Sequence, residues 1–311
     1  MTRTTNMPCL LAVILVFGMS PLRAAAQSVD DVLNTAWEMF WQQSGYPRAV
    51  YKWRTPIRVR FSGAFGERQK VFAMEQLEKV ADVAGIKVVE ADDPSANLLI
   101  EIASSSTTRP YNETCTTSSR AQNGVFERSR VLTNEQSIFR CMLHESMHVM
   151  GLPGHPMANS VLTYFARPSG LTDVDKLLLK TIYSDEVEPG MSPFAVLAIL
   201  ARIVENSAAD KNDARRATAA FVARTSKDME AFASGSGEPP AAVLRSSKAD
   251  SGGMARGRTE MQFFLGMAYL KGQLVGVEDA KARHWLTQAA NSSHAGARRV
   301  LADLAMPIPP R

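Results

Sequence analysis

The sequence predicts an α+β domain followed by a region built only of helices. Three observations lead to this prediction. Up to residue 191, apolar residues recur with both helical and strand spacing, in the order helix, strand, helix, three strands and helix. After residue 191, every apolar pattern has helical spacing. The length of 311 residues also corresponds to about two domains, at roughly 100–200 residues per domain.

The elements of the first domain follow from apolar periodicity and from the residues that end each segment. Val71, Met74 and Leu77 recur at helical spacing and Gly85 follows as a stop, which predicts a helix over 67–84. The other expected elements are helices at 30–41, 133–150 and 171–183 and strands at 57–61, 86–89, 98–103 and 125–132. Residues 104–120 are rich in Ser and Thr and are expected to form a loop around Cys115.

The remainder of the chain is expected to contain two helices, a linker and a further helical region. Helices are predicted at 193–205 and 213–224, and helical spacing returns over 259–305. Residues between them are poor in large apolar side chains and rich in Ala, Gly, Ser and Pro, which predicts a flexible linker. The predicted organisation is a signal peptide at 1–26, a first domain at 27–191, a helical pair at 192–225, the linker at 226–257 and a helical module at 258–311.

The composition excludes several classes of protein. With 45% hydrophobic and 21% charged residues, the chain is neither collagen-like nor fully disordered. Lys and Arg number 35 against 31 for Asp and Glu, a net charge of +4. The basic residues form no cluster, so we expect no nucleic-acid partner.

The first 26 residues have the pattern of a secretory signal peptide. Arg3 precedes an unbroken apolar run over 9–19, and the small residues at 24–26 suit cleavage near Ala26. The run is too short to span a hydrocarbon core of ~30 Å, so no stable membrane insertion is expected after cleavage. Cleavage removes Arg3 and Arg23, and the net charge falls to +2. We therefore predict a periplasmic or secreted protein.

Two cysteines, Cys115 and Cys141, remain after the signal peptide and its Cys9 are removed. In an oxidising compartment such a pair most simply forms one disulfide, whereas the alternative is two buried free thiols. A disulfide here would connect the helix predicted at 133–150 to the segment around Cys115.

The predicted helix at 133–150 carries an HExxH pattern at 144–148. Thr133 and Gln136 fit a capping box at its start, and Gly151 is expected to end it. His144 and His148 are one turn apart on one face, so both imidazoles can reach one zinc ion at ~2.0–2.1 Å. Glu145 beside them is suited to act as general base towards water and later as general acid.

A catalytic zinc site usually has three protein ligands and one open position. The sequence after Gly151 resembles the metzincin metalloproteases, in which a glycine turn brings the third ligand back to the metal. Here Gly154 occupies the expected ligand position and His155 follows one residue later, so His155 is the favoured third ligand. The alternatives are carboxylates further along the chain, namely Asp173, Glu186 and Glu188.

Residues 160–164 resemble the methionine turn of metzincins, with Leu162 in place of methionine. The two residues have similar apolar volumes, so the floor of a metal site can be kept. In astacin-like members a tyrosine at the position of Tyr164 stabilises the oxyanion of the transition state. The resemblance implies that role for Tyr164, and the alternative is a core tyrosine.

The match is closer to an exported bacterial family known as DUF2927, which the chain resembles over roughly residues 29–191. The stretches that carry the resemblance are Cys141-Met-Leu-His-Glu, Gly151-Leu-Pro, Ser160-Val-Leu-Thr-Tyr, Leu171-Thr-x-x-Asp and Pro189-Gly-Met. Some members lack a complete HExxH pattern, so the resemblance alone does not imply activity.

Residues 264–290 resemble one Sel1-like repeat, a relative of the tetratricopeptide repeat made of two antiparallel helices. Small residues such as Gly266 and Ala282 would let the helices approach, and Tyr269 and Trp285 would fill the space between them. A helical repeat normally needs about three copies, and this sequence shows one. The resemblance implies a possible protein partner for this module.

Taken together, these patterns predict an exported zinc metallopeptidase that acts on a peptide or protein substrate. Its one zinc ion would be held by His144, His148 and His155, with Glu145 and Tyr164 as catalytic residues. One alternative is a catalytically inactive zincin-like envelope protein that binds proteins through its Sel1-like helices. Another is a protein in which zinc only stabilises the fold.

Overall fold

The computed structural model describes residues 28–102, 115–164, 168–245 and 250–305. The described part contains one sheet of five strands, a two-stranded ribbon, and helices both among the strands and after them in the sequence. This arrangement agrees with the α+β prediction. The expected signal peptide at 1–26 lies outside the described residues. None of the described helices is long and apolar enough to cross a lipid bilayer.

The five-stranded sheet is mostly parallel and has the order β4-β3-β5-β7-β6. Its strands are β3 (Ile57–Ser62), β4 (Val88–Glu90), β5 (Leu98–Ile102), β6 (Cys115–Gln122) and β7 (Val125–Thr133). β3 pairs in parallel with β4 and β5, and β5 with β7, whereas β6 runs antiparallel to β7 at the sheet edge. The short ribbon consists of β1 (Trp41–Gln42) and β2 (Tyr46–Pro47).

The edge strand β6 corrects one expectation. Residues 104–120 were expected to form a loop, but those from Cys115 onwards form a strand, and residues 104–114 lie outside the described part. Asn123 and Gly124 both have positive φ, at 51° and 78°, and join β6 to β7 in a tight hairpin. The Ser- and Thr-rich composition reflects an edge strand whose residues are mostly exposed, not a loop.

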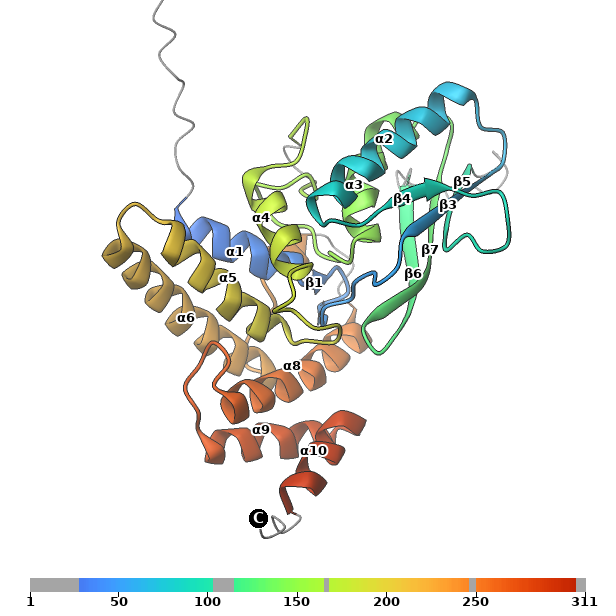
Figure 1. The fold of residues 1–311 in the computed structure, drawn as a ribbon. Coiled ribbons are helices and arrows are strands. Elements are labelled where there is room, and N and C mark those ends of the chain that lie inside the picture. Colours follow the sequence, from blue (N-terminus) through green and yellow to red (C-terminus); the bar gives the residue numbers. More distant parts are fainter. Residues whose placement is uncertain (1–27, 103–114, 165–167, 246–249, 306–311) are drawn as a thin grey trace, which may run out of the picture.

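Two helices pack beside this sheet (Figure 1). α2 (Glu67–Val83) packs against α3 (Ile138–Val149), and α3 also contacts β6 and β7. Leu77 of α2, Ile100 of β5 and Met142 of α3 are buried in the same apolar cluster. This packing fixes the position of α3, on which the HExxH pattern lies.

The start of α3 differs from the expected capping box. Thr133 is the last residue of β7, and the helix begins at Ile138 after the N-cap residue Ser137. Asn134 provides the turn, since its Oδ1 accepts hydrogen bonds from the backbone N–H groups of Gln136 and Ser137 at 3.1 and 2.8 Å. The pairing of Thr133 in β7 excludes it from the capping role.

The remaining helices form one body with the first part of the chain. They are α1 (Val29–Met39), α4 (Asp173–Ile182), α5 (Pro193–Ser207), α6 (Lys211–Ser234), α7 (Ala241–Arg245), α8 (Ser251–Lys271), α9 (Asp279–Asn291) and α10 (Ala295–Ala305). α1 contacts α5 and α6, and α8, α9 and α10 follow as a stack at the carboxy-terminal end (Figure 1). A single cluster of buried apolar residues extends from α1 to α9.

The structure differs from the flexible linker expected at 226–257. α6 continues to Ser234, α7 follows, and α8 starts at Ser251, while residues 246–249 lie outside the described part. The ring of Phe232 is buried at 5.2 Å from that of Trp41. A Cβ on Gly257 would lie 2.0 Å from the backbone oxygen of Gly45. The small residues of this segment therefore let α8 pack against the turn between β1 and β2.

Candidate metal centre

Helix α3 places the HExxH residues and a glycine turn ends it. His144 and His148 are one turn apart on α3, with Glu145 beside them. The helix reaches Met150 as its C-cap, and Gly151 then has φ of +100°. A Cβ on Gly151 would also lie 2.1 Å from the backbone oxygen of Tyr51, so both the turn and the close approach require glycine.

The loop after Gly151 is held against the end of α1 and returns His155 to α3. The backbone N–H of Gly154 donates to the oxygen of Met39 at 2.8 Å. A Cβ on Gly154 would lie 2.1 Å from the oxygen of Glu38, so a side chain here would push the loop away. Glu38 accepts a hydrogen bond from the backbone N–H of Met157 at 2.8 Å, and burial raises the pKa of its carboxyl group.

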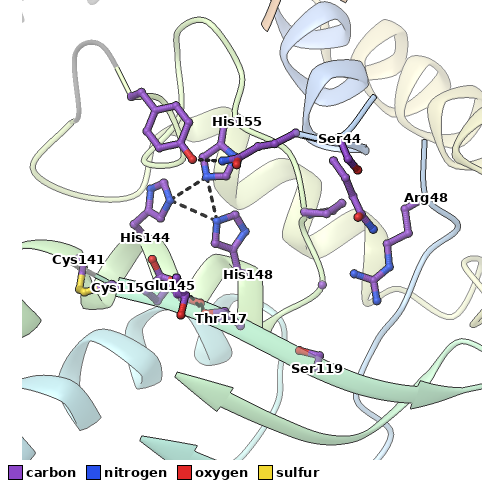
Figure 2. Close-up of a pocket in the computed structure, with 16 residues that line it drawn as sticks. Ser44, Arg48, Cys115, Thr117, Ser119, Cys141, His144, Glu145, His148 and His155 are labelled. Carbon is purple, nitrogen blue, oxygen red and sulfur yellow. Dashed lines mark hydrogen bonds between the residues drawn. A yellow bond between two sulfur atoms is a disulfide. The ribbon is translucent and has the colours of Figure 1, made fainter. Parts of the chain in front are cut away.

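The Nε2 atoms of His144, His148 and His155 form a nearly equilateral triangle, shown by the dashed lines of Figure 2. Its sides are 3.1 Å from His144 to His155, 3.2 Å from His144 to His148 and 3.1 Å from His148 to His155. Nitrogen ligands at ~2.0–2.1 Å from a tetrahedral ion lie about 3.3 Å apart. The triangle therefore has the size that three ligands of one metal ion require.

The outer nitrogens of two rings fix which ring atom faces the centre. Nδ1 of His144 lies 3.0 Å from the oxygen of Val161, and Nδ1 of His148 lies 2.6 Å from that of Leu152. A carbonyl oxygen only accepts, so each Nδ1 carries the hydrogen, and each neutral ring turns an Nε2 lone pair inward. Nε2 lone pairs directed at one point are the arrangement in which histidines bind a metal ion, so these residues fit one.

Among the described residues, His144, His148 and His155 are the group of His, Cys, Asp and Glu side chains that could hold a metal ion. The alternative third ligands lie elsewhere and are paired with cations. Asp173 is close to Lys176 at 3.7 Å, Glu188 lies 2.5 Å from Arg54, and Glu186 pairs with Arg202. The structure thus brings the favoured third ligand, and none of the three carboxylates, to α3.

Two further side chains complete the group around the histidines. Glu145 is only 4% exposed, and the hydroxyl of Thr117 donates to its Oε2 at 2.6 Å. The ring of Tyr164 stacks on that of His155 with centroids 4.2 Å apart, and its hydroxyl accepts a hydrogen bond from the Gln43 amide. Tyr164 is 44% exposed, so it belongs to the site and not to the core.

Comparison with known proteins places these residues inside one family segment. The sequence profile described as "Protein of unknown function (DUF2927)" matches residues 26–202, more than half of the chain. The chain belongs to the DUF2927 family. No curated protein and no solved structure matches it. The DUF2927 segment contains the five-stranded sheet, α3 and every site residue named above, whereas α6 to α10 follow it.

Within the DUF2927 segment, a disulfide joins Cys115 at the start of β6 to Cys141 of α3, as expected, with Cα atoms 6.4 Å apart. It ties the strand that carries Thr117 to the helix that carries Glu145. The position of β6 relative to α3 is therefore fixed by a covalent bond as well as by packing.

The turn expected to form the floor of the site is buried beneath His144. Leu162 is fully buried, and the oxygen of Val161 is the partner of His144. Asp175 of α4 holds this turn, since it accepts hydrogen bonds from the Ser160 hydroxyl at 2.5 Å and from the Val161 backbone N–H at 3.1 Å. Asp175 thus acts on the site through the backbone of the turn.

The histidines open into a cavity of about 460 Å³ in the DUF2927 segment (Figure 2). It is lined by Gln42, Gln43, Ser44, Arg48, Cys115, Thr116, Thr117, Ser119, Cys141, His144, Glu145, His148, Gly151, Pro153, His155 and Tyr164. Sequence reasoning did not place Thr117, Asp175, Gln43 or Arg48 at the site. The Asn-Gly pair at 123–124 is the signal that could have placed Thr117 on a strand.

Proposed function

We propose that this protein is an exported zinc-dependent metallopeptidase with a metzincin-like catalytic domain and a carboxy-terminal helical module that binds proteins. The observation that carries the proposal is the convergence of three histidine Nε2 atoms beside Glu145, on the wall of an open cavity. Zinc is the metal we propose because imidazole is a usual zinc ligand and three protein ligands leave a position for substrate.

The residues of the cavity have the chemistry that amide hydrolysis needs. Zinc bound by the three histidines would polarise the scissile carbonyl and lower the pKa of a coordinated water towards about 7. Glu145 accepts the proton of the attacking water and later donates it to the leaving amine. The Tyr164 hydroxyl, on the same cavity, donates a hydrogen bond to the oxyanion as it develops. Glu145 needs a defined orientation for both steps, which the Thr117 hydroxyl supplies.

Strand β6 offers a place for the substrate backbone. It is at the edge of the sheet, and four of its residues line the cavity: Cys115, Thr116, Thr117 and Ser119. The free side of an edge strand can pair with an extended peptide. A peptide bound in this way would pass beside Glu145, which supports a peptide as the substrate.

The last three helices support the proposed Sel1-like module. α8 and α9 pack closely, because a Cβ on Gly266 would lie 2.6 Å from Cγ of Leu286. Tyr269 and Trp285 are both buried, which supports the proposed resemblance. Val277 in the connection between α8 and α9 is 64% exposed, an apolar side chain available to a partner.

Metal analysis together with a cleavage assay tests the proposed function. The purified mature protein is expected to contain about one zinc ion per chain and to cleave members of a broad peptide library. One zinc with no cleavage would instead favour an inactive zincin-like protein. Unfolding on chelation would favour a zinc that only stabilises the fold, whereas a retained fold would count against that role.

Replacing Thr117 by Val tests how Glu145 is positioned. The change removes the hydroxyl that donates to Glu145 but keeps a branched side chain in β6. We expect cleavage to fall about 10–100-fold, the usual cost of losing such a supporting contact, with the zinc content unchanged. Ser118→Val on the same strand, outside the cavity lining, is the matched control and should keep full activity. Equal activity of the two variants would show that the hydroxyl is not needed.

A further inference from the structure

Arg48 brings a positive charge to the cavity without an acidic partner. It follows β2, and its backbone N–H is fixed by a hydrogen bond to the oxygen of Phe40 at 3.0 Å. Among the residues that the structure describes, other arginines pair with carboxylates, for example Arg54 with Glu188 and Arg58 with Asp93. In that same part of the chain, no carboxylate forms an ion pair with Arg48.

The guanidinium of Arg48 is held in place by an aromatic ring. Its central carbon lies 4.0 Å from the centroid of the Tyr51 ring. Burial lowers the pKa of the guanidinium, and the side chains of Tyr51 and Tyr46 partly oppose that effect. The group nevertheless keeps its charge, because an arginine is not deprotonated in proteins. The contact with Tyr51 restrains the guanidinium. A guanidinium has five N–H donors, so its contact with one tyrosine leaves donors able to bind an anion.

The surroundings of Arg48 suit one anionic group of a ligand. Figure 2 shows Arg48 and Ser44 on one side of the cavity, with His144 and Glu145 on the other. Of the described residues that line the cavity, Glu145 is the one acid, and it is already bonded to Thr117. The fork of N–H donors on a guanidinium matches the two oxygens of a carboxylate.

We propose that Arg48 is a specificity-determining residue that binds a carboxylate of the substrate. This carboxylate is either the carboxy-terminal group of a peptide or the side chain of an Asp or Glu near the scissile bond. The inference rests on the proposed peptidase function, since it names the substrate class of that same cavity.

Paired peptides test this inference by binding, independently of cleavage. The probes are fluorescent hexapeptide mixtures, prepared once with a free carboxy terminus and once as the amide. A second pair consists of amides that carry Glu or Gln at one position. Affinities are measured on zinc-loaded protein with Glu145→Gln, which is not expected to turn over the probes, and kcat/KM is measured on protein that keeps Glu145.

Arg48→Gln is expected to weaken binding of the carboxylate member by about 10–100-fold and to change the neutral member less than about twofold. Arg48→Lys should fall between, because it keeps the charge and loses the fork. The pair that responds identifies the source of the carboxylate. Arg54→Gln, which removes an arginine outside the cavity lining, is the control and should change neither member.

An equal loss for both members of each pair, or no loss at all, would overturn the inference. If Arg48→Gln does not fold, Arg48→Lys decides by the same comparison. Cleavage by the unmodified protein without a preference for the carboxylate member of either pair would remove this subsite and leave the peptidase. Binding that depends on Arg48 without any cleavage by protein that keeps Glu145 would remove the peptidase and leave the subsite.

Discussion

Replacing Glu145 by Gln is expected to slow peptide cleavage by about 10²–10⁴-fold while the zinc content stays near one ion per chain. Gln keeps the size of the side chain and an oxygen that can accept the Thr117 hydroxyl. It cannot take a proton from water, so the loss falls on the chemical step. The two measurements are kcat on a cleaved peptide and metal content by mass spectrometry.

Glu78→Gln, an exposed acid on α2, is the matched control for this variant and should retain full activity. Retention of more than a tenth of the activity in Glu145→Gln would contradict the role of Glu145. If neither Glu145→Gln nor protein that keeps Glu145 cleaves any peptide of a broad library while zinc is bound, the enzyme claim fails and the inactive alternative stands.

Replacing His148 by Ala is expected to lower zinc affinity by more than about 100-fold. The variant removes one of three nitrogen ligands, and even the loss of a contact behind a ligand typically costs 10–100-fold. The remaining Nε2 atoms of His144 and His155 stay 3.1 Å apart, but two ligands do not make a tight site. Competition against a chelator of known affinity measures the change.

His284→Ala is the control for the metal prediction, since His284 is an exposed residue of α9. It should bind zinc as tightly as the unmodified protein. Stoichiometric zinc of unchanged affinity in His148→Ala would show that the metal lies elsewhere. A loss in both variants would point to an effect on folding, which circular dichroism would detect.

Much of the candidate site could be predicted from sequence because its parts are local. His144, Glu145 and His148 lie within five residues, and a helix brings them to one face without any help from the rest of the chain. Gly151 marks the end of that helix, since a non-glycine residue rarely adopts its positive φ. His155 follows within a few residues, so the turn alone can return it.

The residues that sequence reasoning missed are those that the fold brings from far along the chain. Thr117 reaches Glu145 only because β6 pairs with β7 and is linked to α3 by a disulfide. Gln43 and Arg48 reach the cavity from the ribbon of β1 and β2, about a hundred residues before the HExxH pattern. No short-range pattern records such contacts.

The segment 226–257 shows how composition alone can mislead. Glycines and alanines predict a linker when they are exposed, but they also occur where two backbones approach closely. Gly253 and Gly257 are examples of close approach. A Cβ on Gly253 would lie 2.3 Å from the backbone oxygen of Ser44, and a Cβ on Gly257 would lie 2.0 Å from that of Gly45. Only the packing of α8 distinguishes the two cases.

The most direct measurement is a crystal structure of the zinc-loaded protein with data collected at the zinc absorption edge. The account predicts one anomalous peak within ~2.0–2.1 Å of Nε2 of His144, His148 and His155, with a fourth position open to the cavity. A peak bound by other residues, a fourth protein ligand that closes the site, or no peak at these histidines would contradict it.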